Sequence, residues 1–428
     1  MILPSVVQQH AEEASSLRAT RSYLVTASHI QLDDLARADE RLAAHLDGLA
    51  VAGDEGLKAV LAAIMEEMED PGVGEFFAAA VRLIEDRNVP RLEWLLDLAE
   101  ALLPGRQGVV SAFGWVSTAS QQGITQALLE SPCAFRREVG LAACAMHRVE
   151  ADKTITQALQ DADESLRARA LRVAANTGRV KLLPLCSNGM ADADARCVYE
   201  AARAVTLLGE RYSSLGVLEQ IALAPEPEPW RCSALMLLLK RRAPEAGHQI
   251  LKSLPQDAEG IRLLIRGTGI AGDAQYVPWL ISQMSDDKLA RLAGEAFSFI
   301  TGLDLSEPDF YREMPEEVET GPTEDADDED VSMDEDEDLP WPNPAKVEAW
   351  WRDNAKRFTP GTRYFIGAPP SPSHCLSVLR HGYQRQRIAA AEWLCLLKPG
   401  TPLFNTAAPA KRQMQWLDAM DAGAATSR

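Results

Sequence analysis

Apolar residues recur along this chain at the spacing of helix faces, and the pattern itself repeats at a nearly constant interval. Val139, Ala142, Ala143 and Met146 occupy positions i, i+3, i+4 and i+7. The same spacing returns in two later sets, which are Ala170, Val173, Ala174 and Thr177, and then Ala201, Ala204, Val205 and Leu208. Because these sets follow one another at steps of about 31 residues, the sequence predicts an all-α fold, an α-solenoid of helix-turn-helix repeats.

The extent of this pattern divides the chain into four predicted regions. The repeat begins at Val73 and its last clean set ends just before Gly302. We predict an N-terminal helical region over residues 1–72 and a repeat array over 73–303. An acidic disordered insertion follows over 304–343, and a C-terminal helical region with a last repeat-like unit covers 344–428.

Turn residues set the predicted ends of individual helices. Asp163 precedes a helix that should begin at Glu164 and stop at Gly178, because Asp caps a helix start and Gly favours its end. Pro104 should end the helix that Pro90 opens. The Pro-rich stretch over residues 224–229 predicts a stiff extended spacer, and Asn343 followed by Pro344 predicts another helix start.

Charge is distributed unevenly along the chain. The formal net charge is −20, of which residues 1–130 carry −11, residues 301–339 carry −17, and residues 340–428 carry +7. Between Glu313 and Asp338 there are 15 acids and no Lys or Arg, so this stretch is predicted to stay unfolded. This balance argues against binding to nucleic acid or to an anionic membrane, and it favours a cationic partner.

Cysteine usage and the N-terminus predict a cytoplasmic protein. The seven cysteines are odd in number and show no Cys-x-x-Cys pair, which argues against a disulfide framework or a zinc ribbon. Residues 1–5 show no basic stretch followed by an apolar one, as a secretory signal would, and no apolar run is long enough for a membrane-spanning helix.

The repeats resemble HEAT repeats, whose second helices share this small-residue register. Several of these helices also carry an arginine near the start, as HEAT repeats often do, and the examples are Arg167, Arg231 and Arg291. The resemblance implies a HEAT/armadillo-like array.

Three stretches are more specifically similar to a family of HEAT-repeat proteins encoded in the type VI secretion gene clusters of Gram-negative bacteria. They run from Asp39 to Gly48, from Ala293 to Gly302 and from Gln384 to Glu392, so the similarity spans most of the chain. It implies a setting in secretion or interbacterial competition, and it supplies no catalytic residues.

Motifs of enzymatic chemistry are weak in this sequence. Gly267 to Gly272 matches G-x-G-x-x-G, but the surrounding strand-helix-strand pattern of a dinucleotide fold is missing. His374, Cys375, His381 and Cys395 show no metal-ligand spacing, and there is no G-x-S-x-G or H-E-x-x-H. The sequence therefore predicts a protein that is not an enzyme and has no cofactor and no metal.

Arginines on the predicted second helices are the candidate partner-binding residues. They are Arg136, Arg167, Arg203, Arg231, Arg262 and Arg291. In HEAT-like stacks these helices line the concave face, where the arginines could bind a carboxylate-rich partner. The alternative is that they form salt bridges between repeats, with Asp163, Asp192 and their equivalents.

The acidic insertion leaves three possibilities. It could be a solvated spacer, a weak calcium binder without an EF-hand pattern, or a segment that contacts basic residues of this chain or of a partner.

The predicted function is a non-catalytic protein-binding scaffold. The family resemblance implies a type VI secretion accessory, an adaptor or chaperone for an effector or a spike component. The alternatives are a cytoplasmic immunity protein that neutralises an effector and, third, an enzyme on a helical-repeat scaffold.

Overall fold

The computed structural model describes residues 2–66, 72–224, 229–255, 257–315 and 334–426. Across these ranges the secondary structure consists of 22 α-helices, four short 3-10 helices and three isolated β-bridges, with no strand. The predicted all-α class is therefore confirmed. The predicted spacer over residues 224–229 lies mostly outside the described residues.

The chain forms two compact units. Unit 1 comprises Met1–Gly209 and Pro399–Arg428, and unit 2 comprises Glu210–Lys398. The predicted C-terminal helical region, residues 344–428, divides between unit 2 and unit 1 at residue 398. The four regions predicted from the repeat pattern therefore do not correspond to these units. We describe each unit by itself.

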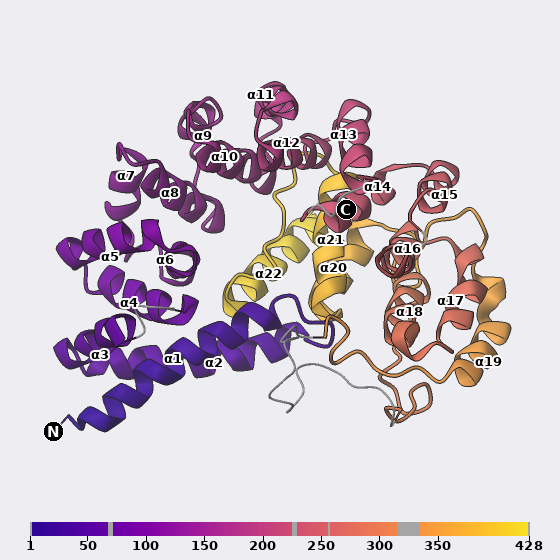
Figure 1. Cartoon of the computed structure of the whole chain (residues 1–428), viewed down its shortest axis with the longest axis horizontal. Helices are drawn as coiled ribbons and strands as arrows, with labels where there is room; N and C mark the ends of the chain where they lie inside the picture. The colour runs from indigo at the N-terminus through magenta and orange to yellow at the C-terminus, as the bar shows by residue number, and fades with distance from the viewer. Residues whose placement is uncertain (1, 67–71, 225–228, 256, 316–333, 427–428) are drawn as a thin grey trace. The chain divides into compact units, whose positions relative to one another are not determined.

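The described residues of unit 1 form thirteen α-helices, most of which stack in successive pairs. They are α1 (Pro4–Leu24), α2 (Leu32–Val51), α3 (Asp54–Glu66), α4 (Val73–Glu85), α5 (Val89–Ala101), α6 (Leu103–Trp115), α7 (Ile124–Leu129), α8 (Ala134–Met146), α9 (Asp152–Ala158), α10 (Glu164–Asn176), α11 (Leu183–Asn188), α12 (Ala195–Leu207) and α22 (Ala410–Thr426). The 3-10 helices η1 (Val180–Leu182) and η2 (Gly189–Ala191) flank α11. Helices α4, α6, α8, α10 and α12 each pack on the next, while α5, α7, α9 and α11 each pack on the helix that follows them (Figure 1).

Small apolar residues allow these second helices to approach closely. Ala143, Ala174 and Ala204, which belong to the register seen in the sequence, are each at most 1% exposed. Gly108 shows how tight the contact is, because a Cβ placed there would lie 2.6 Å from the Cβ of Phe76 on α4. The helical periodicity thus identifies the buried faces correctly.

The cap and the stop predicted for one helix are both present at the ends of α10. The side chain of Asp163 accepts a hydrogen bond from the backbone N–H of Leu166, and Gly178 ends the same helix with a φ of +67°. The prediction for Pro104 is wrong, because α5 already ends at Ala101 and Pro104 lies in the first turn of α6. Proline fits a first turn, where its missing N–H would have no helical acceptor.

The C-terminal segment of unit 1 is held by polar contacts with helices far away in sequence. Arg21 on α1 pairs with Asp39 on α2 at 2.5 Å, and its other N–H groups donate to the carbonyls of Ala407 and Ala408 at 3.0 Å. The carboxylate of Asp39 also accepts from the backbone N–H of Ala410 at 2.7 Å. Helix α22 consequently packs against α2.

In the part of unit 2 that the structure describes there are nine α-helices. They are α13 (Ser213–Ala222), α14 (Arg231–Arg241), α15 (Pro244–Lys252), α16 (Ala258–Ala271), α17 (Val277–Gln283), α18 (Asp287–Thr301), α19 (Pro344–Asn354), α20 (Pro372–His381) and α21 (Gln384–Leu397), with the 3-10 helices η3 (Ala274–Tyr276) and η4 (Ala355–Arg357). Helix α16 packs between α14 and α18, and α20 packs on α21. The predicted start of α19 is confirmed, since the Asn343 side chain accepts from the N–H of Lys346 and Pro344 follows it.

Disorder was predicted over the whole of residues 304–343, and this is wrong for residues 304–315 and 334–343. The backbone N–H of Arg312 donates to the carbonyl of Trp341, and that of Asn343 donates to the carbonyl of Phe310, both at 2.8 Å. Leu305 and Trp341 are buried. Residues 304–315 and 334–343 are ordered because they bury apolar side chains and form these hydrogen bonds. A count of acidic residues does not reveal such contacts. Residues 316–333 of the predicted insertion lie outside the described residues.

Candidate functional site

The three predicted arginines of unit 1 all contact acceptors within the chain. Arg136 on α8 pairs with Glu93 and Asp97 on α5. Arg167 on α10 binds Asp192 through two parallel hydrogen bonds of 2.8 Å. Arg203 on α12 donates to the side-chain oxygen of Asn176 on α10 at 3.4 Å and lies 3.6 Å from Glu200.

The three predicted arginines of unit 2 are also engaged. Arg231 on α14 lies 3.5 Å from Glu259 on α16, while Arg262 and Arg291 contact Asp336 and Asp334. At five of the six positions, all except Arg203, the arginine forms an ion pair with a separate element of the chain. Such pairing is the alternative that the sequence left open. Binding of these arginines to a partner stays a prediction.

A cluster in unit 2 joins four arginines to one short acidic segment, Asp334 to Asp336, which we name the acidic turn. Arg262 binds the Asp336 carboxylate at 2.8 Å, and Arg266 binds that of Glu335 at 2.7 Å. Arg291 binds Asp334, and Arg385 on α21 donates to the carbonyl of Glu335 at 2.8 Å. The Asp336 residue is only 2% exposed. The acidic turn therefore sits on arginines of α16, α18 and α21 that lie 43 to 74 residues away in sequence.

The arginines keep two of these carboxyl groups ionised. Burial raises the pKa of Asp334, but hydrogen bonds from Arg291 and from the backbone N–H of Asp336 outweigh it and leave the pKa below its ordinary 3.8. The hydrogen bond from Arg266 is the main reason why the pKa of Glu335 also lies below its ordinary value. The acidic turn is therefore anionic wherever its contacts with the arginines are intact.

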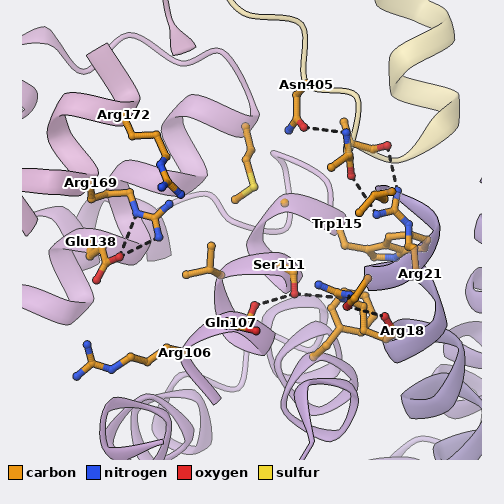
Figure 2. Close-up of a pocket in the computed structure, with 18 of the residues that line it drawn as sticks. Arg18, Arg21, Arg106, Gln107, Ser111, Trp115, Glu138, Arg169, Arg172 and Asn405 are labelled. Carbon is orange, nitrogen blue, oxygen red and sulfur yellow. Dashed lines mark hydrogen bonds and ion pairs between the residues drawn. The ribbon is translucent and has the colours of Figure 1, made fainter. Parts of the chain in front are cut away.

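Unit 1 contains a second arginine-rich site, a pocket of about 570 Å³. Among the described residues, six arginines line it, together with a single acid, Glu138. They are Arg18 and Arg21 on α1, Arg106 on α6, Arg169 and Arg172 on α10, and Arg196 on α12. Figure 2 shows Arg169 and Arg172 on one side of the pocket and Arg18 and Arg21 on the other. We name it the arginine pocket.

Three arginines of the arginine pocket have carboxylate partners. Arg21 pairs with Asp39, Arg169 binds Glu138 at 2.8 Å, and Arg172 binds Glu200 on α12. Both Glu138 and Glu200 are buried. These pairs fix three guanidinium groups and cancel their charges.

The other three, Arg18, Arg106 and Arg196, form no ion pair with any described residue. Arg18 donates to the hydroxyls of Ser111 and Ser22, at 3.3 and 2.5 Å, and Arg106 donates twice to the carbonyl of Glu100. Neutral acceptors orient Arg18 and Arg106 without cancelling their charge. Three positive charges of the arginine pocket are thus left uncompensated by the described residues.

None of the six pocket arginines was among those predicted from the sequence. Arg169 and Arg172 lie one helical turn apart and could have been noticed as a pair on one face of α10, although such a pair is usually solvated. Arg18 and Arg21 lie one helical turn apart on α1 in the same way, but their neighbours in the pocket come from helices many residues away.

The other predicted features have structural explanations. Gly267 to Gly272 form the last turn and the left-handed cap of α16, so this motif ends a helix where a phosphate-binding loop would begin one. The Nε2 atom of His374 lies 2.7 Å from the backbone carbonyl oxygen of Phe365 in unit 2, within hydrogen-bond distance. All seven cysteines are free thiols. Within the described ranges no cluster of His, Cys, Asp and Glu could hold a metal, and no helix is long and apolar enough to cross a membrane.

Comparisons of the chain with protein-family models, curated proteins and solved structures find no significant match. The geometry of the acidic turn and of the arginine pocket is therefore the basis for inferring a function.

The depressed pKa of Asp334 predicts how acid will affect unit 2. A carboxylate whose pKa is lower in the folded state contributes stability above its ordinary value of 3.8, and the contribution is lost as the pH falls through its folded value. We expect Asp334→Asn to lower the urea midpoint of unit 2 near neutral pH, and we expect the difference from the native chain to disappear in acid below pH 3.8.

Asp309→Asn is the matched control, since Asp309 is exposed and forms no ion pair with a described residue. It should leave the midpoint unchanged at every pH. A deficit for Asp334→Asn that stays constant from neutral pH into acid would show that the ionised carboxylate is not what holds the acidic turn.

Proposed function

We propose that this chain is a non-catalytic scaffold that binds carboxylate-rich segments of a partner protein through arginines on its second helices. The single observation that carries this proposal is the acidic turn. Its three consecutive acids bind Arg262, Arg266 and Arg291, so the chain contains an example of the recognition that we propose for a partner. Arginine is suited to this task because its planar fork of N–H groups matches a carboxylate.

We further propose that the stacked helix pairs form a HEAT-like α-solenoid. Three features support this architecture: the step of about 31 residues between registers, the packing of each second helix on the next, and the placement of α7, α9 and α11 on the other side of the stack (Figure 1). Such stacks present one long row of second helices, which suits the binding of extended partner segments.

A tethered acidic turn has a consequence for affinity. Because it is part of the chain, its effective concentration at Arg262 and Arg291 is on the order of millimolar or higher. A partner must displace it, so only a segment with several acids in similar spacing should compete. The acidic turn would then prevent partners with few acidic residues from binding.

The biological setting rests on the family resemblance of the sequence. It supports a cytoplasmic accessory of type VI secretion, an adaptor or chaperone that holds an effector or a spike component. The second candidate is an immunity protein that binds an effector in the cytoplasm, and a carboxylate-binding scaffold serves either role. The third class, an enzyme on a helical-repeat scaffold, has no residue set to support it.

A peptide added in trans tests the proposed recognition. The peptide copies residues 334–339, and the protein is the full chain with Asp334→Asn, Glu335→Gln and Asp336→Asn, so that its arginines have lost the tethered acids. In fluorescence anisotropy we expect this chain to bind the peptide more tightly than the native chain does, and we expect the affinity to fall with added salt.

Adding Arg262→Gln and Arg291→Gln should remove this binding. The matched control is the pair Lys346→Gln and Arg352→Gln, which deletes two exposed positive charges of unit 2 that form no ion pair with a described residue. Equal peptide affinity in the two chains, each with five substitutions, would contradict recognition by Arg262 and Arg291. Circular dichroism confirms that each chain remains helical.

The adaptor and the immunity role separate genetically in the organism that carries the gene. Loss of an adaptor should abolish secretion of its linked effector, because the effector can no longer be loaded. Loss of an immunity protein should leave secretion intact and make the cell sensitive to its sister cells. Secretion assays and competition assays on the deletion strain distinguish the two, and a strain with neither phenotype would contradict both roles.

A further inference from the structure

The arginine pocket of unit 1 differs from the arginine cluster around the acidic turn, because fewer carboxylates than arginines are present in it. Asp39, Glu138 and Glu200 neutralise three of its six arginines, and Arg18, Arg106 and Arg196 remain without one. By contrast, all six arginines predicted from the sequence lie within ion-pair distance of an acid. We propose that the arginine pocket binds a small polyanion, a molecule that carries at least two carboxylate or phosphate groups.

Two of the three unneutralised guanidinium groups, those of Arg18 and Arg106, are held in place before any ligand arrives. Arg18 lies over the ring of Phe77 at 5.4 Å from its centroid, and Arg106 lies over Phe135 at 5.0 Å. Arg18 uses its Nε and Nη1 atoms for serine hydroxyls, and Arg106 uses Nε and Nη2 for one carbonyl, so each keeps an Nη group that no described residue accepts. Such prepositioned donors lower the entropic cost of binding an anion.

Mutual repulsion among these cations favours an anion between them. Burial, aided by the charge of Arg21, lowers the pKa of Arg18 to about 10. Burial also lowers the pKa of Arg169, and the nearby charges of Arg172 and Arg196 act in the same direction against the attraction of Glu138. A bound polyanion would relieve this repulsion, since each of its charged groups can meet two or more guanidinium groups at once.

The size of the pocket indicates a small molecule. Its volume of about 570 Å³ falls within the range of roughly 300 to 1,000 Å³ that is typical of small-molecule sites. Between the arginines the lining includes neutral polar groups such as Gln107, Ser165 and Asn405, and apolar ones such as Val110 and Met146. A compact carbon or phosphate skeleton with anionic groups at its ends fits this arrangement. Carboxylate and phosphate oxygens make the same hydrogen bonds to arginine, so the experiment must distinguish the two sources.

This site is separate from the acidic turn and the arginines that bind it. The arginine pocket is formed by α1, α4, α6, α8, α10, α12 and residues 405–409 of unit 1, whereas the acidic turn and its arginines belong to unit 2. Variants of one site therefore leave the other unaltered. Failure of either proposal can be recognised independently.

Isothermal titration calorimetry on the full chain tests the proposal with two probes, citrate for carboxylates and inorganic pyrophosphate for phosphates. Acetate serves as the reference with a single charge. We expect citrate, pyrophosphate or both to bind in a buffer of physiological ionic strength, and acetate to show no measurable binding. Arg18→Gln and Arg196→Gln should each weaken that binding by about tenfold or more, because a hydrogen bond to a charged group is lost.

The matched control is Arg91→Gln, which removes an exposed arginine of unit 1 that lies outside the pocket and forms no ion pair with a described residue. It should leave the affinity unchanged. Neither Arg18 nor Arg196 has a carboxylate partner to be left uncompensated, so the ligand-free variants should keep the thermal midpoint of the native chain or exceed it. Citrate or pyrophosphate should then raise the midpoint of the native chain and of Arg91→Gln more than that of either pocket variant.

The outcomes separate clearly. Binding of citrate alone assigns carboxylates to the site, and binding of pyrophosphate alone assigns phosphates. If neither anion binds the folded native chain, the proposal is overturned. It is also overturned if Arg18→Gln and Arg196→Gln bind as tightly as Arg91→Gln, or if the pocket variants alter only the binding of an acidic peptide, since that result would assign the site to a protein segment.

Discussion

Arginine–carboxylate pairing between successive helices is the interaction on which this structure depends. Close packing of small residues brings the second helices together, and it also brings their arginines into partly buried positions. An arginine placed there without a carboxylate would lower the stability by several kcal/mol. Arg167 with Asp192, Arg169 with Glu138 and Arg172 with Glu200 meet this requirement along unit 1. The pairing also fixes how each helix is placed against the next, because a bidentate guanidinium tolerates little rotation.

The two candidate sites are the places where neighbouring helices do not supply enough acids. In unit 2 the missing carboxylates come from the acidic turn, a distant segment that binds Arg262 and Arg291. In unit 1 the described residues supply none for Arg18 or Arg196, and we infer that a ligand does. The same physical requirement, that a partly buried guanidinium needs acceptors for its N–H groups, connects the stability of the stack to both proposed functions. Backbone carbonyls supply these acceptors at Arg363 and Arg412, and we infer that anions supply them at the two candidate sites. The proposals differ in whether the anion belongs to a protein segment or to a small molecule.

Local signals in the sequence predicted much of the helical structure but little of either site. Helix α10 could be predicted because its apolar spacing, its cap at Asp163 and its end at Gly178 all lie within one short continuous stretch of sequence. The contact of Arg21 with Ala407 joins residues 386 apart, and no periodicity reports how the C-terminal segment returns to α1. The acidic turn was predicted to be disordered, as part of the acidic insertion, from the composition of the sequence alone. Arginines such as Arg291 compensate its charge, and only the fold brings them to it.

A double-mutant cycle between Arg167 and Asp192 is the most direct test of the central claim, that arginine–carboxylate pairs join successive helices. The cycle requires urea unfolding of the native chain, Arg167→Gln, Asp192→Asn and the double variant. Both side chains are largely buried, at 19% and 13% exposure, and they form two parallel hydrogen bonds. We predict a favourable coupling free energy of about 1 to 3 kcal/mol. A coupling near zero would show that the stack is held by apolar packing alone and would contradict the claim.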